Sequence, residues 1–133
     1  MTDTTTTKTR PLSPHVSIYR WPITMAMSIA HRITGGALYV GTLFLAAWLM
    51  AAASGEGAFE TVNGLFNSFI GRCILFLYTL ALVHHLVGGV RHFFWDTRTY
   101  LLEKHCATKT AWATVFISII ATLLIWIVGY CVR

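Results

Sequence analysis

The sequence predicts an all-α membrane protein with three transmembrane helices, an N-terminus in the cytoplasm and a C-terminus in the periplasm. The first observation is composition: 56% of the 133 residues are hydrophobic and 11% are charged, whereas soluble domains average about 45–50% apolar and ~25% charged residues. The second is that the apolar residues form three runs, each near the ~20 residues that a helix needs to cross the hydrocarbon layer. The third is an uneven distribution of Lys and Arg around these runs, which predicts their orientation.

Residues 1–21 are predicted to form a mobile or interfacial segment on the cytoplasmic side, followed by a membrane domain at 22–133. Residues 1–9 are rich in threonine and lack hydrophobic periodicity. The first apolar run is too long for the hydrophobic region of a signal peptide, so we expect no cleavable signal. Pro22 predicts the first turn of a helix that begins below the membrane and continues into the first span.

The spans and their connections follow from hydropathy and turn residues. The segment 54–69 contains glycines and acidic residues but no Lys or Arg, and it predicts a polar loop on the outer side. Residues 91–110 are expected to connect the second and third spans on the inner side. The spans themselves are predicted at 33–53, 70–90 and 111–132.

The basic residues indicate orientation and not nucleic-acid binding. Although the formal net charge is +5, these residues flank apolar runs instead of forming a patch with interleaved aromatic residues. Of the ten Lys and Arg residues, eight lie before the first span, at its start or in the inner connection, and only Arg72 and Arg133 lie on the other side. Because cytoplasmic segments carry the excess of positive charge, the N-terminus is expected in the cytoplasm. The three cysteines have no CxxC spacing and predict no metal site or disulfide framework.

The second predicted span contains two adjacent histidines, His84 and His85, well inside its apolar run. Ionisable side chains within a span usually face a bundle interior and mark a site. Successive helical positions are ~100° apart, so the two rings point in different directions and one of them is the expected ligand. His85 shares a face with Gly88 and Gly89, which are expected to leave room for a flat macrocycle, and a neutral imidazole is a common axial ligand of haem iron. The alternative is that His85 only hydrogen-bonds a neighbouring helix.

Arg91 and His92 follow one to two turns after His85, near the expected cytoplasmic boundary. Propionates of a bound haem would need cationic partners at that depth. An arginine at a helix end that extends its head into the lipid headgroup layer explains Arg91 equally well.

Ser28 and Arg32 are four positions apart and share one face of the first helix. They offer a hydroxyl and a guanidinium with five donors, and such a pair can hold a carbonyl oxygen of a small planar ligand. Gly35 and Gly36 continue this side with small residues suited to close packing. The alternative is a serine bonded to its own backbone and an arginine that only sets the topology.

Five features of the sequence stand out together: RPLSPH at 10–15, IYR at 18–20, SIAHRITG at 28–35, HLVGGVRH at 85–92 and Asp96. They resemble the cytochrome b anchor subunit of succinate dehydrogenase. The resemblance spans Arg10 to the C-terminus in order and topology, and two separated motifs in the expected spans are more specific than either alone. Residues 1–9, the 54–69 segment and the third span add little beyond length. We assign no role to Asp96.

The resemblance implies a haem b held between this subunit and a second small membrane-anchor subunit, with one axial histidine from each. His85 matches the position of the family's iron ligand. His31, Arg32 and Arg91 match or adjoin positions that contact the haem propionates. Ser28 and Arg32 match positions that line the ubiquinone site.

By the same resemblance, the partners are a flavoprotein that oxidises succinate and an iron–sulfur protein that passes the electrons to quinone, at the bacterial inner membrane. This chain has no flavin or cluster motif, so it would contribute an anchor, one haem ligand and part of a quinone pocket, with no catalysis by itself. One alternative is the anchor of a fumarate reductase or of another quinone-linked cytochrome b. The other is a haem-free transport or assembly module in which His84, His85 and Arg32 form a polar network.

Overall fold

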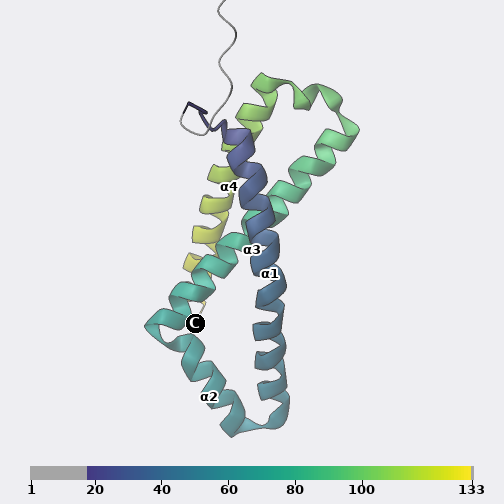
Figure 1. The fold of residues 1–133 in the computed structure, drawn as a ribbon. Helices are drawn as coiled ribbons and strands as arrows, with labels where there is room; N and C mark the ends of the chain where they lie inside the picture. The colour runs from purple at the N-terminus through teal and green to yellow at the C-terminus, as the bar shows by residue number, and fades with distance from the viewer. Residues whose placement is uncertain (1–17, 133) are drawn as a thin grey trace, which may run out of the picture.

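The computed structural model describes residues 18–132, and all regular secondary structure in this part of the chain is helical (Figure 1). The predicted segment at 1–21 therefore lies almost entirely outside the described residues, as do the motif at 10–15 and Arg133. The elements are α1 (Ile23–Ser54), α2 (Glu56–Asn67), α3 (Phe69–Thr97), the short 3-10 helix η1 (Thr99–Leu102) and α4 (Lys104–Cys131).

Three of these helices, α1, α3 and α4, are long and apolar enough to cross a membrane. Their large apolar side chains face outward: Leu43 is 68% exposed, Leu77 62% and Ile127 57%. Such a surface is stable only against lipid or another apolar protein surface. The prediction of an all-α protein with three spans is confirmed, while the direction in which the spans cross the membrane stays a prediction.

The segment 54–69 is not a loop, and that part of the sequence-based prediction was wrong. It forms the 12-residue helix α2, joined to α1 through Gly55, whose φ of 113° suits glycine. Glu56 lies in the first turn, where a negative charge interacts favourably with the helix dipole. The Phe59 ring packs on Trp48 of α1 at 5.8 Å between centroids. The Ser68 side chain then accepts a hydrogen bond from the Gly71 N–H and caps α3.

The inner connection is also shorter than predicted. Helix α3 continues to Thr97 and α4 begins at Lys104, so η1 supplies most of the link. The start of α1 lies at the same end of the bundle as η1, whereas α2 and the end of α4 lie at the other end (Figure 1). Pro22 was predicted in the first turn of this helix, and the structure places it directly before α1, which begins at Ile23.

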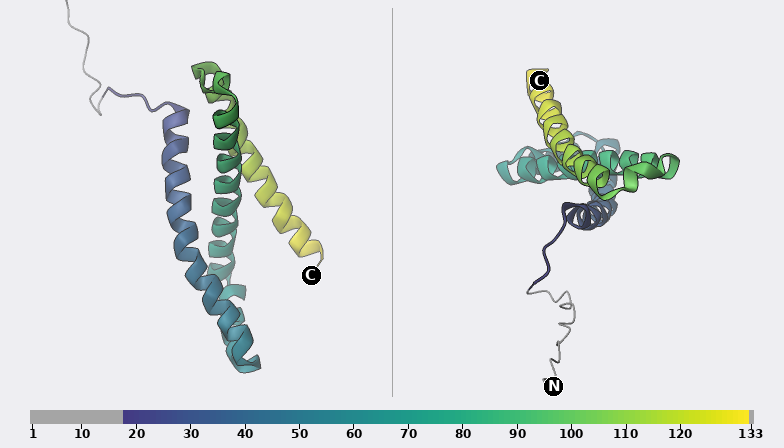
Figure 2. Two further views of the ribbon diagram at one scale, coloured as in Figure 1. Left: turned by 90° about the vertical axis from the view of Figure 1, so that its right-hand side faces the viewer. Right: turned by 90° about the horizontal axis from the view of Figure 1, so that it is seen from above.

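Helix α3 lies between α1 and α4, and α4 diverges from it toward the C-terminus (Figure 2). The crossing with α1 is close at Gly41, where a Cβ atom would clash with the edge of the Tyr78 ring at Cε2 and Cζ. Helix α4 buries a row of small side chains. The hydroxyl groups of Thr114, Ser118 and Thr122 in this row donate to carbonyl oxygens four residues earlier in the same helix. Small residues allow helices to approach closely. The row consists of Ala107, Ala111, Thr114, Ser118 and Thr122.

Candidate functional site

Two imidazole rings stack where α1 crosses α3. The rings of His31 on α1 and His85 on α3 are 4.0 Å apart between centroids, with planes only 3° from parallel. The His92 ring lies 5.2 Å from His31, and the Trp95 ring lies 4.8 Å from His92. A row of four aromatic side chains therefore runs from the middle of α3 toward its C-terminal end.

Glycine makes the stack possible on each helix. A Cβ atom at Gly35 of α1 would lie 3.0 Å from Cε1 of His85, and one at Gly88 of α3 would lie 2.7 Å from Nδ1 of His31. Each ring thus occupies the space that a side chain on the opposite helix would fill. The two glycines set the separation of α1 and α3 at this level.

His85 is fixed through one of its ring nitrogens. Nδ1 lies 3.1 Å from the carbonyl oxygen of His31 and 3.3 Å from Oγ1 of Thr34. The Thr34 hydroxyl itself donates to the Ala30 carbonyl at 2.9 Å. Because a carbonyl oxygen only accepts, Nδ1 is the donor in this contact, and in the neutral tautomer with the proton on Nδ1 the lone pair lies on Nε2. No side chain among residues 18–132 hydrogen-bonds that Nε2, and an imidazole held in this way is suited to bind a metal.

The glycines beside His85 differ from the sequence-based expectation. The prediction that Gly88 leaves open space was wrong, because the His31 ring occupies it. At Gly89 a Cβ atom would meet nothing within 4 Å. His84 has a buried Nε2 without a hydrogen-bond partner, whereas His85 is held through its Nδ1.

Arg91 is almost fully buried and faces α4. Its side chain is 8% exposed, and its guanidinium carbon lies 4.6 Å from the centroid of the Trp95 ring. It lines a cavity of about 190 Å³ between α3, η1 and α4, together with Thr110 and Thr114. Its Nε and Nη1 atoms have no hydrogen-bond partner. Two buried donors without an acceptor carry a desolvation cost that an anion would remove.

Ser28 and Arg32 lie on the exposed side of α1. They are one turn apart, as predicted, but neither contributes to the histidine stack. Gly36 lies on the same exposed side, where a Cβ atom would meet nothing within 4 Å. The structure therefore joins His31 to His85, and it leaves Ser28 and Arg32 on a separate surface of α1 and Arg91 in a separate cavity.

Sequence reasoning gave no role to Thr34 and treated Gly35 only as a packing residue. The available signal was their position three and four residues after His31, which places both on the side of α1 that carries this ring. Nothing in the sequence indicated that the His31 carbonyl would hold His85, because that contact depends on the register between α1 and α3.

Comparison with known proteins agrees with the motifs. A model of the succinate dehydrogenase/fumarate reductase transmembrane subunit family matches residues 6–125. The chain is 40% identical over 121 residues to the succinate dehydrogenase cytochrome b556 subunit of Paracoccus denitrificans, covering 91% of this chain and 92% of the relative. The corresponding subunit of Rickettsia felis is 36% identical over 118 residues, covering 89% and 91%. The mitochondrial cytochrome b560 subunit of Bos taurus is 43% identical over 96 residues, covering 68% and 55%.

Proposed function

We infer the function of this chain from its family: it belongs to the transmembrane subunits of succinate dehydrogenase and fumarate reductase. It is a multi-pass protein of the inner membrane and a membrane subunit of the enzyme complex that its relatives serve. The relatives cited above are named as succinate dehydrogenase subunits, so succinate oxidation is the proposed direction, with the anchor of a fumarate reductase as the alternative.

Within this complex, we propose that the chain would hold haem b through His85. The second axial histidine would come from a second small membrane-anchor subunit. The observation that carries it is the hydrogen bond of His85 Nδ1 to the His31 carbonyl, which leaves Nε2 as a ligand atom. When bound, haem b supplies a one-electron carrier. The residues present fit this group because Gly35 leaves room for the His85 ring and a Cβ atom at Gly89 would meet nothing within 4 Å.

We propose His31, Arg32 and Arg91 as the partners of the haem propionates. His31 lies against His85, which places its ring near the proposed ligand, while its buried Nδ1 without a partner faces Gly88. Arg91 has two buried unpaired donors, and guanidinium groups bind carboxylates strongly. Arg32 is one residue after His31 on the exposed side of α1 and would reach a propionate only at the surface of this chain.

We propose that Ser28 and Arg32 form this chain's part of the ubiquinone site. Both side chains are exposed on one face of α1, so a quinone carbonyl can accept from the hydroxyl and the guanidinium together. The flavoprotein, the iron–sulfur protein and the second anchor subunit are the proposed partners. This chain would bind and orient the quinone, while the partners carry the electrons from succinate.

A reduced-minus-oxidised absorption spectrum of the purified complex tests the haem proposal directly. We expect the bands of a low-spin b-type haem, together with succinate-dependent reduction of ubiquinone. A complex that reduces ubiquinone but contains no haem would leave the family assignment intact and remove the proposed role of His85. A complex without either property would point to the haem-free alternative.

A further inference from the structure

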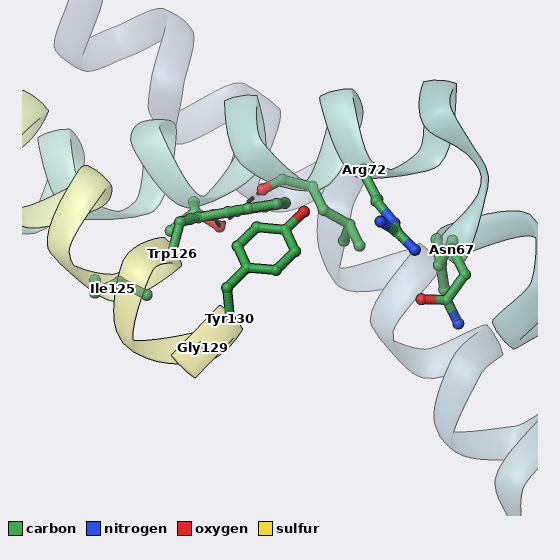
Figure 3. Close-up of a pocket in the computed structure, with 9 residues that line it drawn as sticks. Asn67, Arg72, Ile125, Trp126, Gly129 and Tyr130 are labelled. Atoms are coloured by element: carbon green, nitrogen blue, oxygen red, sulfur yellow. Dashed lines mark hydrogen bonds between the residues drawn. The ribbon is translucent and has the colours of Figure 1, made fainter. Parts of the chain in front are cut away.

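A second cavity lies at the opposite end of the bundle from the histidine stack. It has a volume of about 380 Å³ and lies between the end of α2, the start of α3 and the end of α4. This volume falls in the range of about 300–1,000 Å³ that is typical of small-ligand sites. Its polar lining residues are Asn67, Arg72, Thr79, Trp126 and Tyr130, and the others are apolar or glycine (Figure 3). We call it the Arg72 cavity.

Arg72 gives this cavity its chemistry. Its Nε atom is buried and has no hydrogen-bond partner, and a buried charged donor without a partner is costly. A planar guanidinium matches the geometry of phosphate and carboxylate groups. The cavity therefore favours an anionic group next to Arg72.

The opposite wall is formed by α4 and is held in place by contacts of its own. The Trp126 indole donates to Oγ1 of Thr79 at 3.2 Å, and its ring packs edge-on against Phe76 at 5.4 Å between centroids. The Tyr130 ring lies 5.9 Å from Trp126. In Figure 3 its hydroxyl points toward α3, on the side of the cavity where Arg72 lies. A phenol there can donate to the same anion as the guanidinium.

The surroundings indicate that the anion belongs to a lipid. Arg72 lies in the first turns of an apolar helix whose neighbouring residues Phe69 and Ile70 are 84% and 71% exposed. Val132 at the end of α4 is 82% exposed. Arginine and aromatic side chains at the ends of spans lie at the depth of the lipid headgroups. Apolar lining by Leu75 and Ile125 continues from the cavity toward the hydrocarbon layer.

We propose that the Arg72 cavity binds a membrane phospholipid, with the headgroup phosphate held by Arg72 and Tyr130 and the start of an acyl chain against Leu75 and Ile125. The proposal does not depend on haem or quinone binding. The shared chemistry is that of a phosphate group, and both a lipid headgroup and free phosphate supply it. The test below separates these two sources.

The test is a titration of the delipidated complex, purified with its partner subunits in detergent. Dioleoylphosphatidylglycerol is added and the thermal unfolding midpoint is followed. We expect saturable stabilisation, with a half-saturating concentration roughly tenfold higher in Arg72→Gln, the loss expected for one charge-assisted hydrogen bond. Arg98→Gln, which removes the same charge from an exposed arginine just after the other end of α3, should match the wild type.

Two further ligands identify what is bound. Dioleoylglycerol has the same chains without phosphate, and inorganic phosphate has no chains, so neither should stabilise the complex as the phospholipid does. If either one does, or if Arg72→Gln titrates like the wild type, the proposal is overturned. Should Arg72→Gln fail to assemble, Tyr130→Phe decides: we expect a roughly threefold weaker response from the loss of one neutral hydrogen bond, and an unchanged response overturns the proposal.

Discussion

Replacing Gly35 by alanine should disturb the position of His85 while leaving the helix that carries the glycine intact. The added Cβ would lie 3.0 Å from Cε1 of His85. Ordinary contacts begin near 3.4 Å, so the ring has to move by about 0.4 Å away from α1. That movement would lengthen the 3.1 Å separation between His85 Nδ1 and the His31 carbonyl to about 3.5 Å, the limit of a hydrogen bond.

The two energetic effects of this substitution have opposite signs. A weakened hydrogen bond costs about 0.5–1.5 kcal/mol, while alanine in place of glycine inside a helix gains about 0.5–1 kcal/mol. The stability of the complex should therefore change little. Haem affinity should fall by roughly 10–100-fold, as is typical when the group that orients a metal ligand is disturbed.

Gly36→Ala is the matched control, because it makes the same substitution one residue later, where a Cβ meets nothing within 4 Å. Haem content per complex, measured as pyridine haemochrome after washing with a haem-binding competitor, compares the two variants. We expect Gly36→Ala to retain haem like the wild type and Gly35→Ala to lose it. Equal retention in both variants would refute the argument that Gly35 positions His85.

Three other predictions address the quinone face, the topology and the helix crossing. Arg32→Lys should lower ubiquinone reduction, because an ammonium group cannot reproduce the planar guanidinium beside Ser28. Succinate oxidation measured with a soluble electron acceptor should persist. Unchanged ubiquinone reduction would mean that Arg32 only sets the topology. A cysteine introduced at Gly57 should react with an impermeant reagent in intact cells, because eight of the ten Lys and Arg residues lie on the other side; labelling only in inverted vesicles would mean that the topology is reversed. Gly41→Ala should destabilise the complex by about 1–3 kcal/mol, because the added Cβ overlaps the Tyr78 ring. Gly64→Ala should not, because a Cβ atom there would meet nothing within 4 Å. Equal unfolding midpoints of the two variants would contradict this prediction.

The three spans could be predicted because each is a long apolar run, and a membrane requires every backbone polar group inside it to be bonded within a helix. Helix α2 could not be predicted as readily, because Gly57 and Gly64 lower its helix propensity and resemble loop residues. Its stability comes from packing, including the contact between Phe59 and Trp48. That contact depends on how α2 folds back along α1, which local sequence does not encode.

In the candidate site, too, relations within one helix could be predicted from the sequence and contacts between helices could not. Helical spacing places Ser28 beside Arg32 and separates His84 from His85, since these relations lie within one helix. The stack of His31 on His85 depends on the register between α1 and α3, and so does the filling of the space at Gly88. The burial of Arg91 likewise depends on α4, whose approach to α3 is set by the small row that includes Ala111 and Ser118. Relations between helices were therefore the ones that sequence reasoning missed.

The central claim is that His85, and not His84, binds the haem iron, and paired alanine variants test it most directly. The spectrum of the reduced complex is compared for His85→Ala and His84→Ala. We expect His85→Ala to lose the low-spin bands or convert them to high spin, because it removes the imidazole whose Nδ1 is held by the His31 carbonyl. His84→Ala should leave the bands nearly unchanged. The reverse pattern, with the bands lost in His84→Ala and kept in His85→Ala, would contradict the account.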